Sequence, residues 1–164
     1  AALEAGEIAV AAQAFSEVLA AEPDRVEALA GLARCYLSTG DLEGARATLA
    51  AVPEDGRSNE DVKAAEAALA LAGKAGPAGE SERLKAAVEA DPGNLQARYD
   101  YAMALVAEHA HEQAMDELLA IVKRDKAWED QKARKELLTL FEAIGLADPL
   151  VLAARRKLSA LLFS

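Results

Sequence analysis

Two histidines, His109 and His111, are the residues in this chain best suited to metal chemistry. A metal site on one helix needs ligands about four residues apart, or ligands that the fold brings together in space. Here a single residue separates the two side chains, in a polar run that also contains Glu108 and Glu112. We therefore expect a solvated turn between two helices, with no metal and no other cofactor bound.

The single cysteine, Cys35, has no partner for a disulfide within the chain. Its spacing from Leu32 and Tyr36 places it in an apolar helical pattern, which indicates a packed thiol rather than a reactive one. Phosphate-binding glycine loops, serine nucleophile motifs and paired Cys-x-x-Cys motifs are absent from the sequence. We therefore expect a chain that is not an enzyme, and its cysteine content suits a reducing cytoplasm.

Two blocks of the sequence match each other at helix-packing positions, sixty-nine residues apart. In the same order, the two blocks carry Leu32, Ala33, Gly40, Ala45 and Leu49, and Tyr101, Ala102, His109, Ala114 and Leu118. The separation is close to twice the period of about 34 residues that is typical of the tetratricopeptide (TPR) repeat. Small residues such as Ala45 and Ala114 would lie where the two helices of a hairpin cross.

This pattern predicts an all-α fold, a right-handed superhelix of antiparallel TPR-like hairpins with a C-terminal capping helix pair. We expect repeats over residues 1–127, the first truncated and the third degenerate, and the capping pair over 128–164. Gly6 falls at a turn position, and Asp148 followed by Pro149 is typical of a helix start. The expected helices cover about residues 7–21, 25–38, 42–52, 59–73, 80–90, 95–108, 111–124 and 149–162, with one more after Trp128.

The charge is strongly acidic, with 18 basic and 28 acidic residues and a net charge of −10. This argues against nucleic-acid binding, which needs a basic face. No apolar run approaches the length of about 20 residues that spans a membrane. Residues 123–164 differ from the acidic remainder of the chain, because they contain 9 basic and 6 acidic residues. Either solvated helix faces or a basic docking patch accounts for Lys132, Arg134, Lys135, Arg155, Arg156 and Lys157.

The first helix of each TPR hairpin lines the concave groove of the superhelix. The repeat frame therefore gives candidate groove residues in the second and fourth repeats, namely Glu27, Ala30, Arg34, Leu37, Gln96, Tyr99, Met103 and Val106. Such a mixture of aromatic, aliphatic and basic side chains suits a peptide or an unfolded segment with apolar side chains. Alternatively, Met103 and Val106 pack against a neighbouring helix. A clamp for a terminal carboxylate is not expected, because Asp100 would repel it.

The last third of the chain resembles the C-terminal region of a bacterial protein family. The resemblance rests on DELLAIVKRDKAW at 116–128, ARKELLTLF at 133–141, Asp148-Pro149, and RRKLSALLF at 155–163. The family is the YbbN-like co-chaperones, or chaperedoxins, in which TPR-like helices follow an N-terminal thioredoxin-fold domain. The resemblance covers essentially the whole chain and begins inside the first TPR helix of the family, so we expect the thioredoxin domain to be absent.

The resemblance implies a cytoplasmic stress protein that binds unfolded clients and passes them to a chaperonin or a DnaK-type chaperone. It carries over no catalytic residue, and it places partner docking on the C-terminal helix, at Arg155, Arg156, Leu162 and Phe163. The alternative is a structural or oligomerisation scaffold, which would position an upstream thioredoxin domain and form a homo-oligomer.

Overall fold

The structure is a computed structural model that describes residues 2–74 and 79–163, with side chains from residue 6 onward. Within these ranges the regular structure is entirely helical, which confirms the predicted all-α fold. The α-helices are α1 (Ala2–Ala21), α2 (Val26–Thr39), α3 (Leu42–Ala50), α4 (Glu60–Ala72), α5 (Ser81–Ala90), α6 (Leu95–Ala107), α7 (His111–Arg124), α8 (Trp128–Ile144) and α9 (Pro149–Phe163). A short 3-10 helix, η1 (Glu54–Gly56), follows α3.

Several helices begin where the sequence supplies a capping side chain. The Asp41 carboxylate accepts a hydrogen bond from the Gly44 backbone N–H at 2.9 Å, at the start of α3. The predicted start of α9 is confirmed, since Asp148 accepts from the Leu150 N–H at 2.8 Å and Pro149 is the first helical residue. Each carboxylate satisfies a backbone donor that has no partner within its own helix.

The prediction of a turn at Gly6 is wrong, because α1 runs without a break from Ala2 to Ala21. One glycine inside a helix costs only about 1 kcal/mol relative to alanine, and the alanine-rich flanks have the highest helix propensity. Gly40 does end its helix in the left-handed conformation, with φ of 79°. His109 takes the corresponding place after α6 with φ of 58°, a conformation that histidine adopts more readily than most residues.

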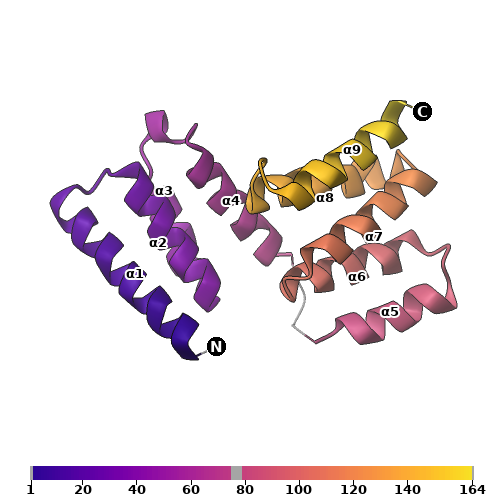
Figure 1. The fold of residues 1–164 in the computed structure, drawn as a ribbon, viewed down its shortest axis with the longest axis horizontal. Coiled ribbons are helices and arrows are strands. Elements are labelled where there is room, and N and C mark those ends of the chain that lie inside the picture. Colours follow the sequence, from indigo (N-terminus) through magenta and orange to yellow (C-terminus); the bar gives the residue numbers. More distant parts are fainter. Residues whose placement is uncertain (1, 75–78, 164) are drawn as a thin grey trace. The chain divides into compact units, whose positions relative to one another are not determined.

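The chain divides into two compact units, Ala1–Gly73 and Lys74–Ser164. In the first unit α2 packs against α1, α3 and α4 (Figure 1). Phe15 of α1 lies directly against Gly31 of α2, where a Cβ atom would come within 2.4 Å of the ring. The core of this unit consists of Leu29, Ala30, Ala33, Leu49, Val52, Val62 and Ala65.

In the second unit α7 is the central helix, since α6, α8 and α9 all pack against it (Figure 1). The helices α8 and α9, which the sequence separates as a capping pair, therefore belong to the same compact unit as α5, α6 and α7. The largest fully buried side chains of this unit come from α7, α8 and α9, and they are Phe141, Leu118, Ile121, Leu137, Leu140, Val122 and Val151.

The short helix α5 follows a glycine-rich segment, and a residue beyond the end of α6 holds its N-terminus. The Glu108 carboxylate accepts hydrogen bonds from the backbone N–H of Gly79 at 2.9 Å and of Ser81 at 3.3 Å. It also accepts from the Ser81 hydroxyl at 2.7 Å, and this bond is the main reason why the pKa of Glu108 lies below its ordinary value. A carboxylate here interacts favourably with the positive end of the helix dipole.

Replacing Ala45 or Ala114 with leucine is expected to destabilise the fold by about 1–3 kcal/mol, because both alanines are completely buried and a longer side chain would overpack the site. Urea unfolding of each variant measures the loss. Ala47→Leu, on the exposed side of α3, is the matched control and should change stability by less than about 0.5 kcal/mol. Unchanged stability in the Ala45 and Ala114 variants would contradict their assignment to close helix contacts.

Candidate functional site

The candidate groove residues of the second repeat lie on α2, and only two of them are exposed. Glu27 and Arg34 face solvent, and Glu27 accepts a hydrogen bond from Arg25 at 2.9 Å. Ala30 has no exposed surface and belongs to the core of the first unit, while Leu37 is half-buried against that core. The surface that this set offers to a partner is therefore polar.

The candidate groove residues of the fourth repeat lie on α6, in the second unit. Gln96 is exposed and donates a hydrogen bond to Asp100 at 2.7 Å. Tyr99, Met103 and Val106 are 7%, 4% and 8% exposed. The structure thus places these three side chains in the interior of the unit, as the alternative interpretation of Met103 and Val106 stated.

A buried polar cluster surrounds Tyr99. Its hydroxyl donates to Glu136 Oε2 at 2.8 Å, and Glu136 is only 3% exposed. The Lys74 ammonium donates to both Glu136 oxygens, at 3.0 and 2.9 Å. Lys132 lies over the Tyr99 ring, 4.3 Å from its centroid, and over Trp128 at 5.3 Å. Burial, followed by Glu136, raises the pKa of Tyr99 well above its ordinary value.

This cluster joins elements of the second unit, and its polar groups bond to one another. The Glu136 carboxylate accepts hydrogen bonds from Lys74 and Tyr99, and the Lys132 ammonium lies over the rings of Tyr99 and Trp128. Sequence reasoning missed Glu136, although its spacing from Ala133 and Leu140 places it on the apolar face of its helix. A charged residue on such a face was the available signal, because carboxylates are rarely buried without a partner.

The two histidines lie close together, with ring centroids 5.8 Å apart in an edge-to-face arrangement. Burial, followed by the neighbouring His109, lowers the pKa of His111 below its ordinary value. Among residues 2–74 and 79–163, no three side chains of His, Cys, Asp or Glu converge as a metal site. Cys35 is a buried thiol.

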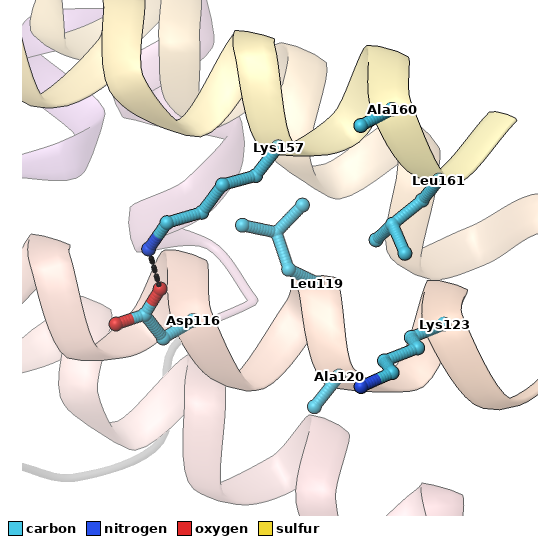
Figure 2. Close-up of a pocket in the computed structure, with 7 residues that line it drawn as sticks. All are labelled: Asp116, Leu119, Ala120, Lys123, Lys157, Ala160 and Leu161. Atoms are coloured by element: carbon cyan, nitrogen blue, oxygen red, sulfur yellow. Dashed lines mark hydrogen bonds and ion pairs between the residues drawn. The ribbon is translucent and has the colours of Figure 1, made fainter. Parts of the chain in front are cut away.

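An open groove between α7 and α9 has a volume of about 530 Å³ (Figure 2). Its walls are apolar along the middle and charged at the ends, as the close-up shows. The lining residues are Asp116, Leu119, Ala120 and Lys123 of α7 and Lys157, Ala160 and Leu161 of α9.

The two ends of this groove differ in charge. Lys157 donates to Asp116 at 2.7 Å across one end (Figure 2), and this bond raises the pKa of Lys157. Lys123, at the other end, forms no ion pair with any residue that the structure describes. The groove therefore combines an apolar middle, one neutralised lysine and one lysine that is open to a partner.

The docking residues expected on the C-terminal helix lie near this groove in sequence but do not line it. Arg155 and Arg156 are exposed, Leu162 is half-buried, and Phe163 is 88% exposed. Other residues of the same helix, among them Ala160, line the groove. The sequence could not single these out, because an alanine forms part of a groove only when a second helix lies beside it.

Across the described part of the chain, no helix has both the length and the apolar character required to cross a lipid bilayer.

Comparison with known proteins identifies the repeats. A family model described as tetratricopeptide repeat matches residues 74–163, and a second model of the same description matches residues 2–69. No curated protein matches the chain. Among solved structures, a domain of protein VP0806 of unknown function from Vibrio parahaemolyticus is 25% identical, with a TM-score of 0.47 over 96% of this chain and 92% of that one. The chain belongs to the tetratricopeptide repeat family.

Proposed function

We propose that this chain is a protein-interaction module that binds an apolar polypeptide segment in the groove between α7 and α9. Tetratricopeptide repeats generally mediate contacts between proteins through surfaces that stacked helices form. The observation that carries the proposal is the groove itself, whose Leu119, Ala120, Ala160 and Leu161 present apolar surface in an open depression. Concave apolar surface with a few charged groups is the usual form of a binding site.

The proposed biological role is that of a cytoplasmic co-chaperone from a bacterium. Its clients would be unfolded proteins, and its partner a chaperonin or a DnaK-type chaperone. Support comes from the resemblance of residues 116–163 to YbbN-like co-chaperones, since the groove is built from these same residues. The exposed side chains of Arg155, Arg156 and Phe163 offer further contact surface on α9.

The exposed surfaces of α2 and α6 have a secondary role in this proposal. Glu27 and Arg34 on α2 and Gln96 on α6 are exposed, so they remain candidates for polar contacts with a client. The buried side chains of Tyr99, Met103 and Val106 would reach a client only if the second unit rearranged.

The proposal predicts that Ala160→Phe blocks binding, because the exposed alanine lies in the groove and a phenyl ring would fill it. Fluorescence anisotropy with a labelled, permanently unfolded carboxymethylated protein measures the affinity, which should fall about tenfold or more. The matched control is Ala153→Phe, on the same helix at an exposed position outside the groove. Equal affinities for the two variants would rule out the groove as the binding site.

A further inference from the structure

We infer that the groove between α7 and α9 takes an amphipathic helix with acidic residues at one end, and that the acidic end lies at Lys123. This inference rests on the proposed function, and it adds the chemical character of the bound segment and the direction in which it lies. It follows from the length of the groove, from the size of its wall residues and from the distribution of its charges.

The length of the groove fits about two turns of a helix. The lining residues of α7 extend from Asp116 to Lys123, and a rise of about 1.5 Å per residue gives a length of roughly 10 Å. A bound helix would present apolar residues at positions i, i+3 or i+4, and i+7 along this length.

The walls of the groove allow a close approach of a third helix. Ala120 and Ala160 are small and lie on opposite walls, whereas Leu119 and Leu161 provide the larger apolar surfaces (Figure 2). Helices pack at interaxial distances of about 8–10 Å, and small residues at the contact favour the short end of this range. A helical segment satisfies its own backbone hydrogen bonds, so it suits a groove between two helices whose backbones are bonded within themselves.

The charges of the groove set the direction of the bound helix. Asp116 neutralises Lys157 at one end, so neither residue attracts a partner strongly. Lys123 is exposed and unpaired among the described residues, so a carboxylate at this end would gain an ion pair. A basic residue at the same end would be repelled.

The overall charge of the chain disfavours a second copy of itself, and the charge of the groove favours an acidic partner. The chain carries a net charge of −10, so two copies repel each other at long range. The residues that line the groove carry two lysines, Lys123 and Lys157, against one aspartate, Asp116, so an acidic partner meets a small local excess of positive charge there.

The test uses the full chain and two labelled peptides in fluorescence anisotropy. Both are amphipathic helices of the same leucine pattern, and one carries two glutamates at one end where the other carries two lysines. Wild type should prefer the acidic peptide. Lys123→Glu should weaken its binding by about fivefold and reverse the preference.

The matched control is Lys126→Glu, which changes the net charge equally at an exposed position outside the groove. If Lys123→Glu and Lys126→Glu lose equal affinity for the acidic peptide while Ala160→Phe still blocks both peptides, the acidic preference is overturned. The groove then remains the binding site. Unchanged binding in Ala160→Phe would overturn the groove as well. The wild type could instead sediment as a dimer, become a monomer in Ala160→Phe, and bind neither peptide. That result would assign the groove to a second copy and overturn the inference.

Discussion

Replacement of Phe141 with alanine is expected to lower the stability of the second unit by about 3–5 kcal/mol. Phe141 is only 1% exposed and is the largest of the fully buried side chains. Its removal loses the transfer free energy of the ring and leaves a cavity that the surrounding helices fill only in part. Trp128 is the single tryptophan of the chain and belongs to the second unit, so its fluorescence during urea unfolding reports this loss.

The control for this experiment is Leu138→Ala, which lies on the same helix but is 47% exposed. We expect its cost to stay below about 1 kcal/mol, because little apolar surface returns to water and no cavity forms. Hydrogen exchange followed by mass spectrometry should show the faster opening of the Phe141 variant among residues 79–163. Comparable losses for the two variants would contradict the packing of α8 described above.

Replacement of Glu136 with alanine is expected to destabilise the second unit by about 2–4 kcal/mol. The substitution leaves the buried Tyr99 hydroxyl without its acceptor and removes both hydrogen bonds of the Lys74 ammonium. Tyr99 is 7% exposed, so its hydroxyl cannot readily bond water instead. A buried donor without a partner costs about 1–3 kcal/mol, and the lost packing of the glutamate side chain adds to it.

Two further substitutions divide this effect between the partners of Glu136. Lys74→Ala should cost less than about 1 kcal/mol, because the lysine side chain is 51% exposed and the pair is screened by water. Tyr99→Phe should restore part of the stability when combined with Glu136→Ala, since it removes the unpaired hydroxyl. Additive losses in that double variant would show that the hydrogen bond between the two residues contributes nothing.

The helices could be predicted from the sequence because their signals are local. Asp148 starts α9 by accepting a hydrogen bond from a backbone N–H, and Gly40 ends α2 because glycine, which lacks a Cβ atom, adopts a positive φ without strain. Gly6 misled the prediction, since a glycine permits a turn without requiring one. Its neighbours determine the outcome, and here they continue the helix.

The candidate site was harder to predict because it depends on contacts between distant residues. The repeat frame assigns Tyr99 to an open groove, but a carboxylate thirty-seven residues further along the chain bonds its hydroxyl. No local pattern shows that contact. The groove at Ala160 is likewise the space that remains after α9 has packed Val151, Ala154 and Leu158 into the core. Such a surface is defined only when both helices are in place.

The bond from Glu108 to the start of α5 bears on how far the repeats can act as exchangeable modules. Glu108 follows α6, yet it supplies the cap of a helix that begins twenty-seven residues earlier, at Ser81. A hairpin cut from the chain between these positions would lose either its cap or the helix that the cap holds. Recombination or grafting that transfers residues 79–108 together preserves this cap, so the smallest segment that carries α5 with its cap also includes α6.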